Sequence, residues 1–302
     1  MNPSRMKPLR ALMSVWDGHV GLLKNACVPS LAWPKNAAAL DGVTFSVLTK
    51  GIHQEEVTEI LKSSGIKFSS IEFTILGPEF EINPHASGMF IKEWICREFS
   101  KAVTYNQAII LTPPDTIFGD GSIHNLRVTG NRRDVVVFAA HMRVLPTIMD
   151  QITEPVSNAK LVSLAMKHKH KTWEESELGA TEINTYVGGV VWQYLDCDLY
   201  ACQHLLPTPY FINPTPEDLV YFKNQIHWGV IDHDWPGECL INSERQRVLG
   251  SSDAAFMVEL TPAEANIPPK APYREDEPDL FWRRKPHNAI NRMNYIILRG
   301  EE

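Results

Sequence analysis

Short apolar runs bounded by turn residues place the strongest constraint on the fold of this chain. The runs are rich in β-branched residues, and they occur at residues 11–16, 44–48, 108–111 and 135–139. Runs of this kind are typical of buried strands. Strands that are apolar on both faces belong in the interior of a sheet that is covered on both sides.

Segments with helical spacing lie between these runs. Residues 54–63 place Val57, Ile60 and Leu61 on one helical face, and residues 89–102 repeat the pattern. Strands that alternate with amphipathic helices predict an α/β fold with a mostly parallel central sheet flanked by helices.

The second half of the sequence is less regular. Residues 185–195 are typical of strands, residues 206–216 carry four prolines and are expected to be extended, and residues 256–260 form another candidate strand. Residues 267–278 again carry four prolines and predict a surface crossing. No linker is evident, so we expect one domain over residues 1–302, with residues 1–145 and 146–302 as its two halves.

Composition narrows the choice of function. The net charge of −7 argues against a protein whose whole surface attracts nucleic acid or an anionic membrane. Five cysteines without a C-x-x-C pair fit a reducing compartment, and no apolar stretch approaches the length of a membrane span. We therefore expect a cytoplasmic protein; the oligomeric state stays open.

The segment around Asp115 and Asp120 is the most informative one. The apolar run at residues 108–111 leads through Thr-Pro-Pro into Asp115, and Asp120-Gly121 follows. Ligands of open α/β sheets bind just beyond the carboxyl ends of the strands. Two carboxylates at such a place are compatible with a hard divalent cation, Mg²⁺ or Mn²⁺. The alternative is a structural turn, in which Asp115 caps the turn that follows it and Asp120-Gly121 supplies a corner with positive φ.

A second dense segment spans residues 227–235. Its titratable and aromatic side chains are Trp228, Asp232, His233, Asp234 and Trp235. A carboxylate or imidazole from this segment is expected at the reacting centre, and a structural turn with aromatic packing is the alternative.

Weaker signals remain. His204 is a candidate ligand of a metal or a phosphate, and Asp196-Cys197-Asp198 is a second candidate metal site. The basic residues 167–171 fit a solvated face better than a phosphate contact. The sequence lacks G-x-x-x-x-G-K-[ST], G-x-G-x-x-G, H-E-x-x-H and G-x-S-x-G, which lowers the weight of P-loop and serine-hydrolase chemistry.

Taken in order, these segments resemble glycosyltransferases of the GT-A type. Residues 13–17 are similar to the first strand of such enzymes and the end of that strand. Residues 114–122 resemble the acidic motif that follows their central strand, in the variant found in glycosyltransferase-like proteins of bacteria and phages. Residues 204–214 and 231–234 resemble a later stretch of those proteins. The usual D-x-D triplet is absent from the central strand, because Asp115 and Asp120 are five positions apart.

The resemblance implies transfer of a sugar from a nucleotide-diphosphate sugar, UDP-linked by expectation, to a hydroxyl of a glycan, a protein or a modified nucleic acid. A divalent cation or basic side chains would offset the charge of the leaving diphosphate. The donor-site residues are then Trp16, Asp17, Thr49, Lys92, Asp115, Arg143 and His204, with Asp120, Asp115 and His204 as metal ligands. Asp232 or Asp234 is the candidate base, and Trp228, Trp235 and His233 contact the acceptor.

Three other functions use the same residues. A metal-dependent hydrolase would act without an acceptor, and a nucleotidyltransferase would bring a glycine-rich basic loop near its first strand, which this sequence lacks. A carbohydrate- or nucleotide-binding module would not need its two acidic segments to converge.

Overall fold

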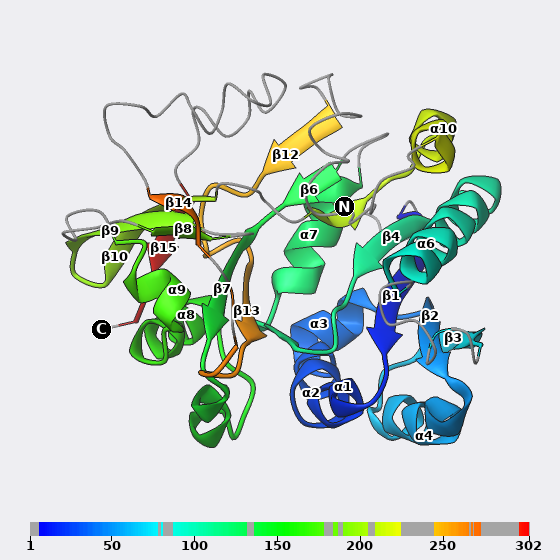
Figure 1. Ribbon diagram of the computed structural model, residues 1–302, viewed down its shortest axis with the longest axis horizontal. Coiled ribbons are helices and arrows are strands. Elements are labelled where there is room, and N and C mark those ends of the chain that lie inside the picture. Colours follow the sequence, from blue (N-terminus) through cyan, green and yellow to red (C-terminus); the bar gives the residue numbers. More distant parts are fainter. Residues whose placement is uncertain are drawn as a thin grey trace.

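The computed structural model of the chain describes residues 6–77, 80, 87–131, 136–177, 184–186, 190–204, 209–224, 245–265, 267, 269–272 and 296–301. Within these ranges the protein is an α/β structure with one large sheet and smaller, less regular sheets towards the C-terminus (Figure 1). The sequence prediction of a mostly parallel sheet flanked by helices is confirmed.

The large sheet has the strand order β12-β6-β11-β4-β1-β2-β3. Its parallel half consists of β1 (Leu9–Val15), β2 (Val43–Lys50), β3 (Phe68–Leu76) and β4 (Ala108–Leu111). The chain moves outward from β1 to β3 and then returns to the other side of β1 with β4. This reversal between β1 and β4 is the topological switch point of an open α/β sheet.

One antiparallel strand interrupts the far half of this sheet. β11 (Pro209–Ile212) lies between β4 and β6 (Val136–Phe138) and runs against both, while β12 (Gln246–Val248) runs parallel to β6. β6 consequently runs in the same direction as β4 and β1.

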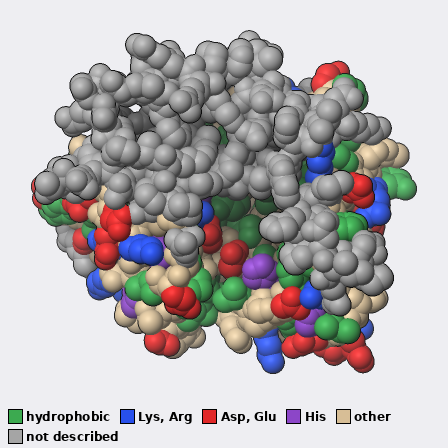
Figure 2. Space-filling model, viewed as in Figure 1, with side chains coloured by type: hydrophobic (Ala, Val, Ile, Leu, Met, Phe, Trp, Pro, Cys, Tyr) green, Lys and Arg blue, Asp and Glu red, His purple; other side chains and the backbone are tan. Residues whose placement is uncertain are grey.

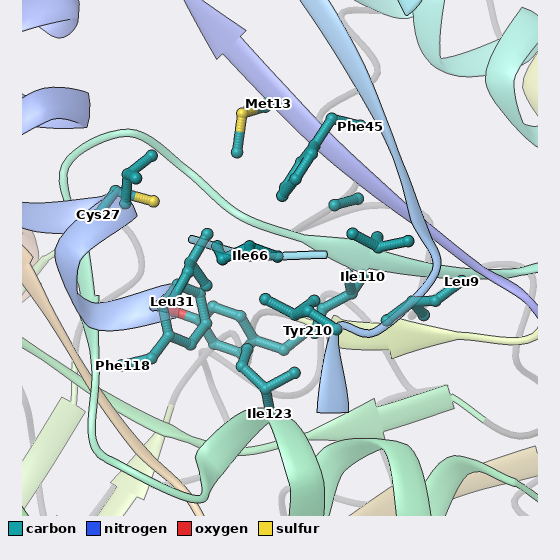
Figure 3. Packing of buried hydrophobic residues seen from close by; sticks show 14 of the residues in the cluster. Leu9, Met13, Cys27, Leu31, Phe45, Ile66, Ile110, Phe118, Ile123 and Tyr210 are labelled. Atoms are coloured by element: carbon teal, nitrogen blue, oxygen red, sulfur yellow. The ribbon is translucent and has the colours of Figure 1, made fainter. Parts of the chain in front are cut away.

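Helices cover both faces of the large sheet. After β1 come α1 (Gly18–Leu22), η2 (Leu23–Cys27), α2 (Val28–Leu31) and α3 (Pro34–Ala39); η3 (Gly51–His53) and α4 (Gln54–Ser63) follow β2, α6 (Ser87–Thr104) precedes β4, and α7 (Ser122–Gly130) precedes β6. Met13 packs with the α1–α4 side (Figure 3), whereas its neighbour Leu12 packs with Trp94 and Phe99 of α6. Neighbouring strand residues point to opposite faces, so the sheet is buried on both.

A small sheet stands beyond the large one. It has the order β5-β13-β7 and consists of β5 (Thr116–Phe118), β13 (Phe256–Leu260) and β7 (Ala140–Val144). β5 follows β4 after four residues, and only Ala139 separates β6 from β7. The chain therefore passes from the large sheet into the small one twice, through four residues after β4 and through one residue after β6.

The remaining elements form the C-terminal side. β9 (Val190–Asp196), β10 (Leu199–His204) and β15 (Ile296–Arg299) form an antiparallel sheet, and β8 (Asn184–Tyr186) pairs with β14 (Pro269–Pro272). The helices here are η5 (Pro146–Gln151), α8 (Asn158–Lys167) and α9 (Lys171–Glu174), whereas α10 (Pro216–Asn224) lies beside α6. Within residues 267–278, which were expected to cross the surface, Pro269–Pro272 forms β14 and pairs with β8.

No helix in the described ranges combines the length and the apolar character that a bilayer span requires.

Candidate functional site

Two polar clusters lie beyond the carboxyl ends of the parallel strands, where an open α/β sheet binds its ligands. One follows β1 and β2 and is built on Asp17. The other follows β4 and includes Asp115. The switch point lies between β1 and β4, so the two clusters lie on opposite sides of it.

The Asp17 cluster joins the ends of β1 and β2. The Asp17 carboxylate accepts hydrogen bonds from Lys50 Nζ at 2.9 and 3.1 Å, and His53 Nε2 lies 3.3 Å from its Oδ1. The backbone N–H of Asp17 donates to the same His53 nitrogen at 3.1 Å. The hydrogen bond from Lys50 is the largest cause that holds the pKa of Asp17 below its ordinary value. The cluster thus holds an ionised carboxylate at the sheet edge.

Aromatic rings stand beside this cluster. Trp16 is half-buried and meets His19 and Phe80 edge to face, with centroid distances of 5.7 and 5.4 Å. Lys50 Nζ lies 5.9 Å from the centroid of Phe80. Trp16 is therefore near the polar cluster, and it also packs against the core under α6.

Two other expected donor contacts are placed differently. Thr49 is fully buried and shares the inward face of β2 with Val47, so its hydroxyl cannot reach a bound nucleotide in this conformation. Lys92 is half-buried in α6. The side chain that reaches the Asp17 cluster from the end of β2 is that of the next residue, Lys50.

The second cluster combines two carboxylates and a guanidinium. Arg143 Nε donates to Glu259 Oε1 at 3.1 Å, and the backbone carbonyl of Asp115 accepts from Leu260 N–H at 2.8 Å. Burial raises the pKa of the Asp115 carboxyl to about 6; repulsion from Glu259 adds to the rise and Arg143 opposes it. Asp115 is consequently a carboxyl that titrates near neutral pH, a property that is common at functional sites.

The sheet topology explains why these side chains meet. β7 continues the direction of β6 and carries Arg143 past the carboxyl edge of the large sheet, while Asp115 leaves that edge directly from β4. Thr116, Glu259 and Arg143 are direct cross-strand neighbours, so their side chains share one face of the small sheet. A hollow near the middle of the molecule brings hydrophobic, acidic and histidine side chains together (Figure 2).

Asp120 has a structural contact that the sequence did not predict. Its Oδ1 accepts the backbone N–H groups of Lys35 and Asn36 at 2.9 and 3.3 Å, which satisfies free donors at the start of α3. Gly121 follows with a φ of 100°, as the positive-φ corner of the structural alternative required.

These contacts bear on the expected metal centre. The Asp120 carboxylate is held by the amides of α3, and that of Glu259 by Arg143, so the donors near Asp115 do not fit a centre of several carboxylates. In the described part of the chain, no group of three or more His, Cys, Asp or Glu side chains is arranged to hold a metal ion. Ligation of a metal by Asp115 and Asp120 stays a prediction.

Other expected candidates lie elsewhere. His204 ends β10 in a separate sheet, and its side chain lies outside the described residues. Cys197 and Asp198, with φ values of 44° and 56°, form the tight turn between β9 and β10. Within the basic run, His170 is buried and caps α9. The predicted base and acceptor contacts, Asp232, Asp234, Trp228, Trp235 and His233, also lie outside the described residues.

Three residues of the two clusters were not singled out from the sequence. Lys50 and His53 follow the predicted strand at residues 44–48, and their position after a strand was the available signal. Glu259 lies inside the predicted strand at residues 256–260, where nothing distinguishes a site carboxylate from a solvent-facing one.

Comparison with known proteins adds little. No protein-family model matches the chain, and no curated protein matches it. Among solved structures, the apo form of mouse xyloside xylosyltransferase 1 is similar, with 13% sequence identity and a TM-score of 0.33 over 44% of this chain and 52% of that one. The match thus spans about half of that protein's length, and a similarity of this size does not assign a function.

Proposed function

We propose that this protein is a glycosyltransferase that moves a sugar from a nucleoside-diphosphate sugar to an acceptor hydroxyl. The observation that carries the proposal is the pair of polar clusters on β1/β2 and β4/β7/β13, one on each side of the switch point. A nucleotide sugar is long enough to need both, because its nucleoside and its reacting carbon lie at opposite ends of a diphosphate.

The two clusters suit different parts of such a donor. The nucleoside lies against Trp16 and the Asp17 cluster, and the diphosphate reaches towards Arg143. As the glycosidic bond breaks, negative charge grows on the diphosphate, and a guanidinium offsets that charge with a bidentate fork of donors. Glu259 orients this guanidinium through its contact with Nε.

Asp115 contributes a carboxyl whose protonation changes near neutral pH. In its protonated form it donates a hydrogen bond to an oxygen of the donor, and in its ionised form it accepts one from a sugar hydroxyl. The base that takes the acceptor proton is proposed to be Asp232 or Asp234, as expected from the sequence.

Ligand binding tests the proposal first. UDP, GDP, ADP, CDP and TDP and their common sugar conjugates are titrated by calorimetry and thermal shift, with and without Mn²⁺. We expect at least one diphosphate to bind. Arg143→Gln should weaken that binding by about tenfold or more, the range for a lost hydrogen bond to a charged group, whereas Arg97→Gln, at an exposed position of α6, should not.

Turnover then separates transfer from hydrolysis. Sugar release that depends on an added glycan, protein or nucleic-acid acceptor supports a transferase, and release at the same rate without any acceptor indicates a hydrolase. Absence of binding for all of these diphosphates and sugar conjugates contradicts the proposal. In a working transferase, Asp232→Asn should lower transfer by about 10²–10⁴-fold with donor binding intact.

A further inference from the structure

We infer that Asp17 recognises the ribose of the bound nucleotide and makes this protein selective for ribonucleotides over 2′-deoxyribonucleotides. The inference rests on the proposed function, because it assumes that a nucleotide binds at this edge of the sheet. It adds a specificity that neither the sequence pattern nor the fold supplies.

The state of the carboxylate fits a pair of hydroxyl donors. The ion pair with Lys50 holds Asp17 ionised, and an ionised carboxylate only accepts hydrogen bonds. The Asp17 side chain is 56% exposed, whereas that of Lys50 is 18% exposed. One side of the carboxylate is thus fixed by the protein and the other faces solvent, where the 2′ and 3′ hydroxyls of a ribose can donate to it.

The position of the carboxylate fits as well. In open α/β sheets that bind dinucleotides, an acidic side chain near the end of an early strand accepts the ribose hydroxyls. Here β2 ends in Lys50, and the carboxylate comes instead from the second residue after β1, where the ion pair with Lys50 links it to β2. The half-buried Trp16 and the ring of Phe80 stand next to the pair and provide an apolar side for the sugar or base.

Charge balance allows a diphosphate nearby. An isolated carboxylate at this edge would repel the anionic donor, but the positive charge of Lys50, 2.9 Å away, compensates that of Asp17. The backbone of Asp17 has a φ of 49°, which is uncommon for a residue other than glycine. Asparagine tolerates positive φ readily, so Asp17→Asn removes the charge at little conformational cost.

The same geometry admits an opposite interpretation, which the experiment separates. If Lys50 and His53 form an anion site that Asp17 merely fills, then a phosphate group of the ligand must displace Asp17. In that case Asp17→Asn would tighten nucleotide and inorganic phosphate binding. If Asp17 accepts ribose hydroxyls, the same change would weaken binding of ribonucleotides more than binding of their 2′-deoxy forms.

The test measures dissociation constants by calorimetry for UDP, ADP, GDP and CDP and for the 2′-deoxy form of each. The proteins are the wild type, Asp17→Asn, and Asp41→Asn as a matched control, because Asp41 is an exposed carboxylate at the opposite, amino end of β2. Circular dichroism confirms folding of each variant.

We expect the wild type and Asp41→Asn to bind the ribonucleotide roughly 10- to 100-fold more tightly than its deoxy form, the range for a hydrogen bond to a charged acceptor. Asp17→Asn should lower the ratio to below about threefold, mainly by weakening the ribonucleotide. Equal binding of both forms by the wild type, an unchanged ratio in Asp17→Asn, or tighter binding by that variant overturns the inference while the proposed function stands. Binding of no nucleotide overturns both.

Discussion

Replacing Asp115 by asparagine is expected to stabilise the fold at neutral and alkaline pH and to leave stability unchanged in acid. The pKa of Asp115 is about 6 in the folded protein, against an ordinary value of 3.8, and burial is the largest cause. The unfolded chain therefore releases this proton at a lower pH than the native chain does. Stability falls as the pH rises between the two values, and the full penalty is present above about pH 6.

The size of the effect follows from the two pKa values. A difference of one pKa unit between the folded and unfolded chain corresponds to about 1.4 kcal/mol, so the rise from 3.8 to about 6 lowers the free energy of unfolding by about 3 kcal/mol. Asparagine removes this penalty but also loses the attraction of Arg143 and the hydrogen bond with Thr116. We therefore expect a gain of roughly 1–3 kcal/mol at pH 8 and none near pH 4.

Urea unfolding of the wild type and Asp115→Asn at several pH values between 4 and 8 measures this gain. Asp41→Asn serves as the control, because its carboxylate is exposed. The reasoning would be refuted if Asp115→Asn were less stable than the wild type at pH 8 and the loss of stability were the same at pH 5. Asp115 would then be an ionised, well-paired carboxylate. A gain in stability accompanied by a loss of transfer is the pattern expected of a strained site residue.

Three further changes test the structure around the site. Arg10→Met should cost up to about 3–5 kcal/mol, because the fully buried Glu98 loses Arg10, 2.8 Å away, and keeps only the partly exposed Lys101 at 2.9 Å; urea unfolding measures this, and adding Glu98→Leu should recover most of the loss. Asp120→Ala should destabilise the protein by about 0.5–2 kcal/mol through the lost cap of α3, and Asp120→Asn by less; equal losses would argue against capping. Gly130→Ala should lower the melting temperature through a cost of about 1–3 kcal/mol, because the added methyl meets the Phe211 ring; an unchanged melting temperature would show that the ring can move.

Local patterns predicted the elements that depend on local sequence. The helix at Gln54–Ser63 was predicted correctly because Val57, Ile60 and Leu61 all become buried, and the strands at Ala108–Leu111 and Phe256–Leu260 match their apolar runs. β3 escaped prediction: it is an edge strand whose residues are mostly only partly buried, so its sequence lacks a continuous apolar run.

The candidate site was harder to predict because it depends on which strands become neighbours. Asp115 and Asp17 follow strands, as the sequence indicated, yet their partners come from other parts of the chain. Glu259 approaches Arg143 only because β13 pairs with β7 in one register, and Lys50 reaches Asp17 only because β1 and β2 are adjacent. Pairing and register of distant strands leave no local signal in a single sequence.

The short passage from β6 to β7 has a mechanical consequence. The chain crosses between the two sheets through Ala139 alone, and this residue is 1% exposed. A buried residue flanked by strands on both sides cannot absorb a large change in backbone angles without disturbing close-packed neighbours. The wall that carries Arg143 and Glu259 is therefore fixed to the large sheet. Any closure over a bound ligand must therefore come from segments other than β7 and β13. Ligand binding should change hydrogen exchange in those other segments, while the amides of β7 stay protected with and without ligand.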